Sequence, residues 1–243
     1  MSRPVALVTG GGQGIGAATC KRLAQDGYDV LLTYNTSSQP AEMLVDEIRQ
    51  SGYDALAVKV DCANDGEVGL LGIHPWMARK IDVLILNHGA YHRVSADQMT
   101  IETLRNTMAI NFEGAVGVYK AVQPHMTAHA RMVVVGSQLG TRGSPHGADY
   151  SASKAALAVW ARSLAQQVGP EGKRVNILAP GYVDTAILAG DSAQKRQQRE
   201  HEVPLKRVGT PEDMAGTIAF LISEDSSYIT GSIIHVNGGL YLP

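Results

Sequence analysis

Short apolar runs alternate with helix-like segments along the whole chain, and this alternation constrains the fold more than any other feature. The runs are apolar at consecutive positions, as in strands whose two faces are both buried. Most intervals between runs leave room for a crossover helix, which parallel strands require. The pattern therefore predicts an α/β fold, with about seven parallel strands in a doubly wound sheet and one domain over residues 1–243. The expected strands are Val5–Val8, Val30–Leu32, Ala55–Val60, Ile81–Leu86, Met132–Val135, Val175–Leu178 and Ile233–Val236.

The segments between these strands carry helical signals. Helices are expected over Pro40–Gln50, Thr100–Met126 and Ser151–Val168. Thr210 followed by Pro211 indicates a helix N-cap with proline at the first helical position. The polar segment Ile187–Val203 fits both a mobile flap over a site and an ordinary surface helix.

Composition narrows the classes of function. Hydrophobic residues make up 44% of the 243 positions, and the net charge is -2 without a run of basic residues. We therefore expect a full core and neither a nucleic-acid nor a membrane partner. Cys20 and Cys62 are the two cysteines, and the first strand begins almost at once, so we expect a reduced, cytoplasmic protein without a leader. No metal site is expected.

A glycine-rich segment lies between the first strand and the first helix, reading Thr-Gly-Gly-Gly-Gln-Gly-Ile-Gly over residues 9–16. Glycine allows positive φ and close backbone approach to an anion, and a helix N-terminus adds unpaired N–H groups. In this position the segment predicts a pyrophosphate site rather than a plain tight turn. Its candidate cofactor contacts are Gly10, Gly12, Gln13, Gly14, Ile15 and Gly16.

The end of the second strand bears on the choice of cofactor. An acid there binds the ribose 2′-hydroxyl in NAD-binding proteins. Tyr34, Asn35 and Thr36 stand here instead, and their hydroxyl and amide groups suit a 2′-phosphate. NADP(H) is therefore favoured, and NAD(H) is the second choice because no arginine is present to clamp a phosphate.

Ser137, Tyr150 and Lys154 form a set that specifies a reaction. Tyr150 and Lys154 are four residues apart in an expected helix, so their side chains point to one side. A neighbouring ammonium favours the phenolate and is expected to lower the pKa of the tyrosine. With a serine hydroxyl to polarise a carbonyl oxygen, the set suits carbonyl reduction or alcohol oxidation. The tyrosine–lysine spacing is a weak signal alone, and its meaning depends on the surrounding motifs.

With these motifs in order, the chain resembles the short-chain dehydrogenase/reductase family over almost its whole length, and within it the 3-oxoacyl-thioester reductases. The glycine segment matches the family's Thr-Gly-x-x-x-Gly-x-Gly, and the tail around Asn237 resembles its last strand. The resemblance implies a Rossmann-type fold and four catalytic residues, Asn111, Ser137, Tyr150 and Lys154. It also implies cofactor contacts from Asp61, Cys62, Asn87, Gly89, Tyr150, Lys154, Pro180, Gly181, Val183 and Thr185.

The chain departs from the family pattern at two places. Asn87-His88-Gly89-Ala90 stands where the family usually has Asn-Asn-Ala-Gly, and Gln13 replaces a basic residue common in NADP-using relatives. We expect His88 to be a structural substitution beside the adenosine half of the cofactor, with titration near neutral pH as the alternative. Gln13 weakens the NADP assignment without reversing it.

The resemblance also implies a mechanism in which hydride passes between nicotinamide C4 and a carbonyl carbon while Tyr150 gives its proton to the alkoxide. Ser137 would stabilise the oxyanion. Lys154 would lower the tyrosine pKa and hydrogen-bond the nicotinamide ribose, and Asn111 would hold a water that links Lys154 to solvent.

The family's ending implies assembly into a homotetramer, with a homodimer second. Gly114 and Gly117 would allow close helix approach in such an assembly. The alternative is that these two glycines merely sit against the sheet of their own chain.

Three loops are expected to determine the substrate, namely Tyr91–Ala96, Gln138–Gly147 and Ile187–Val203. Candidate substrate contacts are Ser137, Gln138, His146, Tyr150, Tyr182 and Ile187. The leading hypothesis is an NADP(H)-dependent oxidoreductase acting on a small ketone or secondary alcohol. The alternatives are a reductase of 3-oxoacyl thioesters, carried on an acyl carrier protein or on CoA, and a non-catalytic nucleotide-sensing scaffold.

Overall fold

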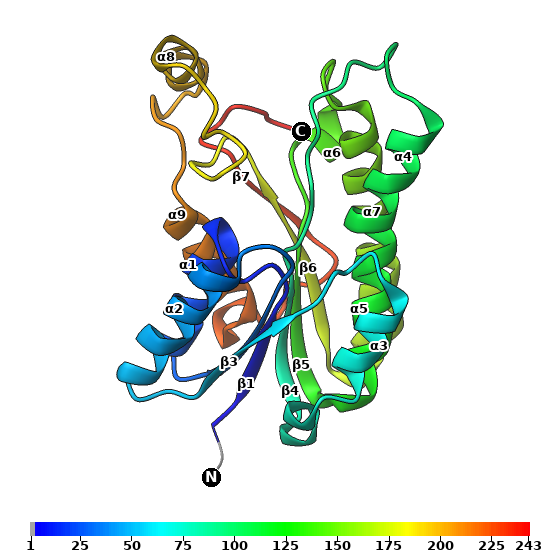
Figure 1. Cartoon of the computed structure of the whole chain (residues 1–243), viewed down its shortest axis with the longest axis vertical. Helices are drawn as coiled ribbons and strands as arrows, with labels where there is room; N and C mark the ends of the chain where they lie inside the picture. Colours follow the sequence, from blue (N-terminus) through cyan, green and yellow to red (C-terminus); the bar gives the residue numbers. More distant parts are fainter. Residues whose placement is uncertain (1–2) are drawn as a thin grey trace.

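Seven parallel strands form one sheet in the order β3-β2-β1-β4-β5-β6-β7. The computed structural model describes residues 3–243, and Figure 1 shows the twisted sheet with helices on both faces. The strands are β1 (Val5–Val8), β2 (Asp29–Tyr34), β3 (Ala55–Lys59), β4 (Ile81–Leu86), β5 (Met126–Val135), β6 (Arg174–Pro180) and β7 (Ile233–Val236). The predicted doubly wound α/β fold is therefore confirmed.

The helices divide between the two faces of the sheet. One face carries α1 (Gly14–Gln25), α2 (Ser38–Gln50) and α9 (Pro211–Ile222). The other carries α3 (Asp65–Gly72), α4 (Ile101–Met108), α5 (Gly114–Val122) and α7 (Ala148–Val168). Two short helices, α6 (Leu139–Arg142) and α8 (Ala193–Glu202), lie beyond the carboxyl ends of the strands, on opposite sides of Figure 1. Within residues 3–243, none of the helices combines the length and apolar character needed to span a bilayer.

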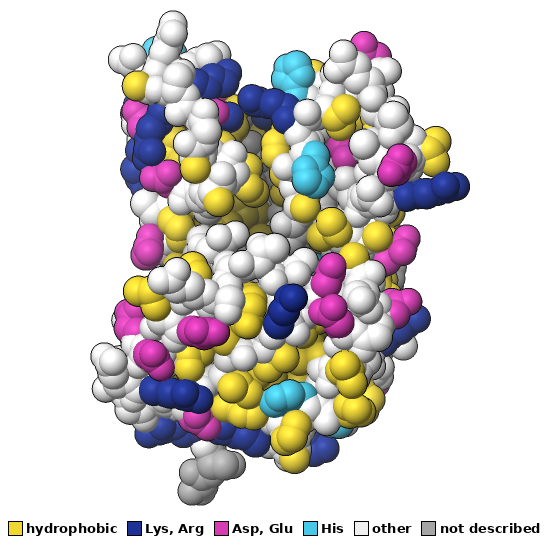
Figure 2. Space-filling model, in the orientation of Figure 1, with side chains coloured by type: hydrophobic (Ala, Val, Ile, Leu, Met, Phe, Trp, Pro, Cys, Tyr) yellow, Lys and Arg dark blue, Asp and Glu magenta, His cyan; other side chains and the backbone are white. Residues whose placement is uncertain are grey.

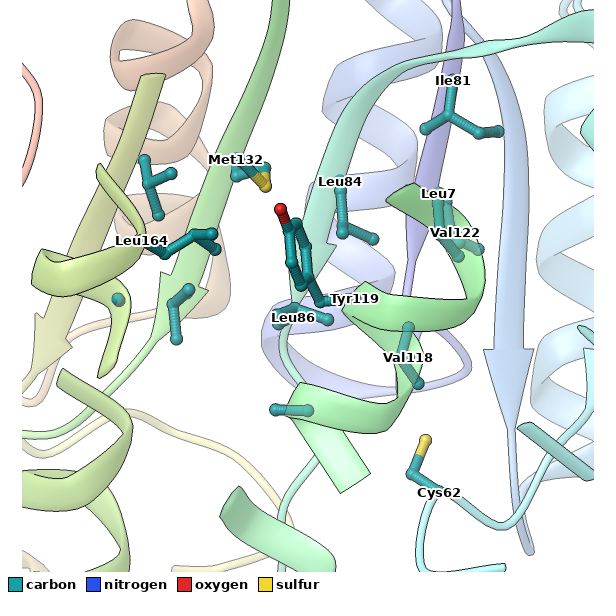
Figure 3. Packing of buried hydrophobic residues seen from close by; sticks show 14 of the residues in the cluster. Leu7, Cys62, Ile81, Leu84, Leu86, Val118, Tyr119, Val122, Met132 and Leu164 are labelled. Carbon is teal, nitrogen blue, oxygen red and sulfur yellow. The ribbon is translucent and has the colours of Figure 1, made fainter. Parts of the chain in front are cut away.

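Successive residues of each central strand supply two apolar cores, one on each face. In β1, Val5 and Leu7 belong to the core under α5 and α7, while Ala6 and Val8 belong to the core under α1, α2 and α9. Tyr119 of α5 points into the core under α5 and α7, among side chains of the strands (Figure 3). The unbroken apolar runs of the sequence thus reflect burial on both faces.

The helix predicted over Thr100–Met126 is interrupted in its middle. A π-helical turn over residues 109–113 separates α4 from α5. Such a turn widens the helix by one residue and is frequent at functional sites. Here it carries Asn111, the asparagine predicted to be catalytic.

The end of the same predicted helix was also misplaced. Pro124 lies in a short 3-10 turn, because proline cannot continue the hydrogen-bonding pattern of an α-helix. Met126 then begins β5 instead of ending the helix, so this strand is longer than the predicted Met132–Val135.

The strand order positions the site. β1 and β4 are neighbours, with Val8 opposite Ile85, yet the chain leaves them for helices on opposite faces. The glycine segment follows β1 and Asn87 follows β4. Because parallel strands end at one edge, these loops meet at the topological switch point where open α/β sheets bind ligands.

Candidate active site

A cavity of about 930 Å³ opens at the carboxyl edge of the sheet. Its walls come from the loops that follow the first six strands, from α7 and from the segment that includes α8. Figure 2 shows a hollow between the two upper lobes of the molecule. Every residue predicted for cofactor or substrate lines this cavity except Gly12 and Gly16, and Asn111, predicted to be catalytic, does not line it. The structure therefore gathers both sets of predicted residues around one space.

The turn after β1 closes tightly on itself. Gly10 has a φ of 62°, in the left-handed region that favours glycine. The side-chain amide of Asn87 donates hydrogen bonds of 3.0 Å to the backbone oxygens of Thr9 and Gly10. A Cβ at Gly16 would overlap the backbone oxygen of Gly10. Gly16 therefore supports the turn from behind and does not line the cavity.

The first turn of α1 is a candidate site for an anion. Gln13 is the N-cap residue, and its side chain makes no hydrogen bond to that turn. Gln13, Gly14 and Ile15 line the cavity at a helix N-terminus that carries partial positive charge. Thr185 lies across from them, since a Cβ at Gly14 would be 3.2 Å from its Cγ2 atom. These uncapped N–H groups fit the pyrophosphate of a dinucleotide cofactor.

The ends of β2 and β3 line the other end of the cavity. The lining residues from the end of β2 onward are Thr33, Tyr34, Asn35, Thr36 and Ser37, without an acid among them. Gly12 lies against this segment, because a Cβ there would be 2.6 Å from the Ser37 hydroxyl oxygen. After β3, the Asp61 carboxylate accepts a 3.0 Å hydrogen bond from the backbone N–H of Ala63 and lines the cavity beside Cys62. This end thus offers hydroxyl and amide groups beside a single carboxylate.

The predicted trio converges on the same cavity. Tyr150 and Lys154 lie one turn apart on α7, and Ser137 follows β5. The Lys154 ammonium is 5.7 Å from the centroid of the Tyr150 ring and donates a 2.8 Å hydrogen bond to the backbone oxygen of Val135. The Ser137 hydroxyl accepts a 3.1 Å hydrogen bond from the N–H of Leu139. Three side chains from two elements therefore face one space.

Burial shifts the pKa of two members of this trio, Tyr150 and Lys154. It raises the pKa of Tyr150 to about 12, while hydrogen bonding with Ser137 acts in the opposite direction. It also lowers the pKa of Lys154 to about 8. The lowered tyrosine pKa expected from the sequence is not found, because desolvation by burial is the largest influence on the Tyr150 phenol and raises its pKa. Tyr150 is consequently a protonated phenol at neutral pH.

Asn111 lies behind the wall of the cavity. Its side chain is fully buried, and its Oδ1 accepts a 2.7 Å hydrogen bond from the N–H of Ala90. Its Nδ2 donates to the Ala90 oxygen at 2.9 Å and to the Ser153 hydroxyl at 3.0 Å. A Cβ at Gly89 would be 3.1 Å from the Asn111 Oδ1 and 3.3 Å from the Lys154 Nζ. Asn111 thus holds the loop after β4 against α7, close to Lys154.

His88 occupies the wall between the glycine turn and Lys154. Its Nδ1 lies 2.7 Å from the Thr9 hydroxyl, and its buried Nε2 has no hydrogen-bond partner within residues 3–243. Burial, and then the charge of Lys154, lower the pKa of His88 to about 4. The ring is therefore neutral near pH 7, as a structural substitution requires, and titration near neutral pH is not supported.

The loop after β6 closes the cavity next to the trio. The N–H of Gln138 donates a 3.1 Å hydrogen bond to the oxygen of Pro180, and its side-chain oxygen accepts one of 3.3 Å from Asn237. A Cβ at Gly181 would be 2.7 Å from the Cβ of Asn237. Gln138 is only 2% exposed, so its side chain mainly ties the wall to the C-terminal tail.

Several residues at the substrate end were not among the predicted contacts. Tyr91 packs edge-on against Tyr150, with ring centroids 4.9 Å apart, and its hydroxyl donates a 2.9 Å hydrogen bond to the His146 oxygen. Four cationic residues also line this end, namely Arg93, Arg142, Lys195 and Arg199. Their loops were expected to determine the substrate, but no local pattern singles out these individual side chains.

Comparisons with known proteins agree with this geometry. Residues 10–241 match a family model described as enoyl-(acyl carrier protein) reductase. The 3-oxoacyl-(acyl-carrier-protein) reductase FabG of Staphylococcus aureus is 32% identical over 241 residues, which cover 98% of each chain.

Solved structures are similar in fold as well as in sequence. A short-chain dehydrogenase from Burkholderia cenocepacia in complex with NADP is 34% identical, with a TM-score of 0.92 over 98% of this chain and 97% of that chain. A blue fluorescent protein from a metagenomic library in complex with NADPH is 33% identical, with a TM-score of 0.92 over 98% of each chain. The chain belongs to the short-chain dehydrogenase/reductase family of oxidoreductases.

Proposed function

We propose that the protein is an NADP(H)-dependent ketoreductase, which transfers hydride between nicotinamide and a ketone or secondary alcohol. The observation that carries this proposal is the convergence of Ser137, Tyr150 and Lys154 on a cavity that also contains an uncapped helix N-terminus. A phosphate cradle and a proton donor in one cavity are what a reductase with a dinucleotide cofactor needs.

In this proposal the side chains divide the work of carbonyl reduction. When bound, a nicotinamide ring supplies the hydride. Tyr150 acts as general acid toward the developing alkoxide and as general base in the reverse direction. Ser137 donates a hydrogen bond to the same oxygen, and Lys154 contributes positive charge and contacts the cofactor ribose. Asn111 holds the loop after β4 against α7, beside Lys154.

Preference for NADP(H) is supported by the end of β2. No carboxylate lies there to accept the ribose hydroxyls, whereas Thr36 and Ser37 supply hydroxyl donors beside Asn35. Relatives of similar fold were solved with NADP and with NADPH. Asn35→Asp should move the preference toward NADH by at least about tenfold in the ratio of dissociation constants, because a carboxylate repels a 2′-phosphate.

We further propose that residues 187–203 act as a flap over the substrate end. The guanidinium of Arg199 lies 4.4 Å from the centroid of the Tyr182 ring, and its Nε donates a 2.5 Å hydrogen bond to Asp191. The Tyr182 hydroxyl donates a 3.1 Å hydrogen bond to Glu202. A few side-chain contacts thus hold α8 over the cavity, and such contacts can open and close.

A homotetramer is proposed as the assembly, with a homodimer second. All four residues of β7, at the edge of the sheet, are half-buried in the isolated chain, and Val159 of α7 is 60% exposed. An unpaired sheet edge and exposed apolar helix faces are surfaces that assembly would cover. Light scattering on the purified protein measures the mass directly, and a monomer would contradict the proposal.

A narrower function, reduction of 3-oxoacyl thioesters, is favoured by the curated relatives. The Staphylococcus aureus FabG, named for that reaction, aligns with 98% of this chain. Purified protein with NADPH should therefore be tested on free ketones and on 3-oxoacyl thioesters, following the absorbance of the cofactor. NADPH binding without turnover of any ketone would favour a sensor over an enzyme.

A further inference from the structure

Positive charge is concentrated at the substrate end of the cavity. Arg93 follows β4, Arg142 ends α6 and Lys195 lies in the first turn of α8, and all three line the cavity. These three residues are called the cationic cluster below. Figure 2 shows lysine, arginine and histidine side chains around the upper part of the hollow. Three segments that are distant in sequence therefore bring like charges to one place.

The carboxylates near the cluster do not neutralise it. The cavity is lined by two acids, and Asp61 lies at the opposite end beside Cys62. The other, Asp191, is paired with Arg199, whose Nε lies 2.5 Å from its Oδ2. Arg199 is only 7% exposed, so its charge is already neutralised by this pair within the wall.

The charges of the cluster act on this pair and on Tyr182. The hydrogen bond from Arg199 lowers the pKa of Asp191, and the charges of Arg93 and Lys195 act in the same direction. Burial and Glu202 raise the pKa of Tyr182, whereas Arg199 and Arg142 lower it. All members of the cluster are therefore within electrostatic reach of the Arg199–Asp191–Tyr182 group.

None of the three cluster members has an ion-pair partner within residues 3–243. The ammonium of Lys195 donates only to the side-chain oxygen of Gln198, at 3.1 Å. Like charges held together repel each other, and an anion bound between them relieves that repulsion. Guanidinium groups also match carboxylate and phosphate oxygens in two-pronged hydrogen bonds.

We propose that the cationic cluster binds an anionic group, a carboxylate or a phosphate, carried by the ketone substrate. This inference rests on the proposed ketoreductase function and narrows its substrate class. In this arrangement the cluster holds the anion while the ketone is presented to Ser137 and Tyr150. Neutral ketones lack this contact and are expected to be poorer substrates.

The test compares matched anionic and neutral ketones at saturating NADPH. A carboxylate arm uses 3-oxobutanoate against ethyl 3-oxobutanoate. A phosphate arm uses the 3-oxobutanoyl thioester of CoA against that of N-acetylcysteamine. For each arm the ratio of kcat/KM for the anionic over the neutral ketone is measured in the wild type, in Arg142→Gln and in Arg93→Gln. Arg49→Gln, at an exposed arginine of α2 away from the cavity, is the matched control.

The cluster variants should lower this ratio by about fivefold each in one arm, since a partly exposed ion pair contributes on the order of 1 kcal/mol. Arg49→Gln should leave the ratio unchanged. A fall in the carboxylate arm identifies a keto acid, and a fall in the phosphate arm identifies a phosphate-bearing thioester. An unchanged ratio in both arms, or a fall caused only by weaker NADPH binding, would overturn the inference.

A second measurement needs no variant. Raising the salt concentration should lower the same ratio for the wild type, because salt screens charge pairs. A ratio that does not respond to salt would count against the inference even if a variant fails to fold. Equal turnover of neutral and anionic ketones would support the proposed ketoreductase function and contradict the preference for an anionic substrate. Absence of turnover on every ketone would instead overturn the proposed function itself.

Discussion

The Lys154 ammonium donates a 2.8 Å hydrogen bond to the backbone oxygen of Val135, the last residue of β5. This bond ties α7 to the carboxyl end of the sheet and satisfies one of the three donors of a buried ammonium. It also turns the charge toward the strand end and places it 5.7 Å from the centroid of the Tyr150 ring. The position of Lys154 leads directly to the first prediction.

Deprotonation of Lys154 should set the alkaline limb of the pH profile for ketone reduction. Burial lowers the pKa of Lys154 to about 8, so the side chain is charged below that pH and neutral above it. We expect kcat/KM for reduction to fall as pH rises through about 8, because the positive charge beside the reacting oxygen is lost. Lys154→Arg should move this limb to higher pH if the variant binds NADPH. If the alkaline fall of kcat/KM stays at the same pH in Lys154→Arg, it belongs to the titration of another group.

Removal of the Tyr150 hydroxyl should abolish most turnover. Tyr150→Phe keeps the ring and its edge-on contact with Tyr91 but removes the proton donor. We expect kcat to fall by roughly 10²–10⁴, the usual contribution of general acid catalysis, with NADPH affinity within about twofold of wild type. Stopped-flow turnover and fluorescence titration of NADPH measure the two quantities. Normal turnover in Tyr150→Phe would exclude the proposed mechanism.

Gly114 and Gly117 of α5 should respond in opposite ways to alanine. A Cβ at Gly114 would be 2.5 Å from the backbone oxygen of Cys62, whereas a Cβ at Gly117 would meet only Val68, at 3.7 Å. Gly114→Ala should therefore destabilise the fold by about 1–3 kcal/mol through overpacking. Gly117→Ala should be neutral or stabilising by up to about 1 kcal/mol, from helix propensity.

Chemical denaturation of the two glycine variants provides the measurement. Equal effects of the two variants on the free energy of unfolding would contradict the intrachain packing of Gly114. A variant that folds normally but no longer assembles would instead place its glycine at a subunit interface. Cys62, which Gly114 contacts, lies at the edge of the core shown in Figure 3.

His88 should make the fold sensitive to acid. Burial lowers its pKa from 6.5 to about 4, so the unfolded chain binds a proton more readily than the folded chain between these values. The stability from this group is present above pH 6.5 and is lost as pH falls toward 4, by roughly 3 kcal/mol in total.

Denaturant unfolding of His88→Asn at several pH values checks this prediction. The variant should lose less stability than the wild type between about pH 6.5 and 4. His92→Asn, at an exposed histidine of the same loop, is the matched control and should behave as the wild type does. If His88→Asn loses as much stability at low pH as the wild type does, the acid sensitivity comes from another titrating group.

Features that depend on local chemistry could be read from the sequence. The strands around Val5–Val8 and Ile81–Leu86 were predicted because burial on both faces leaves an unbroken apolar run. The glycine segment was predicted because positive φ at Gly10 and close packing at Gly16 admit only glycine. Tyr150 and Lys154 share a helix, so their spacing already implied a shared face.

The interruption of the long helix could not be read in this way. Residues 100–126 keep a helical pattern through the π turn, because one extra residue barely disturbs the spacing of apolar side chains. Gly114 was ambiguous for a similar reason, since its partner Cys62 lies far away in sequence. Such contacts arise only when the fold brings the loop after β3 against α5.

The sequence by itself determined the doubly wound sheet, the glycine turn before α1 and the spacing of Tyr150 and Lys154, because each depends on periodicity or conformation within a few neighbouring residues. Only the tertiary structure decided the pKa directions at the site, since burial and the Lys154–Val135 hydrogen bond involve separate elements. It also decided where Arg93, Arg142 and Lys195 meet. Each of them is an ordinary polar loop or helix residue until the fold brings three distant segments to one rim.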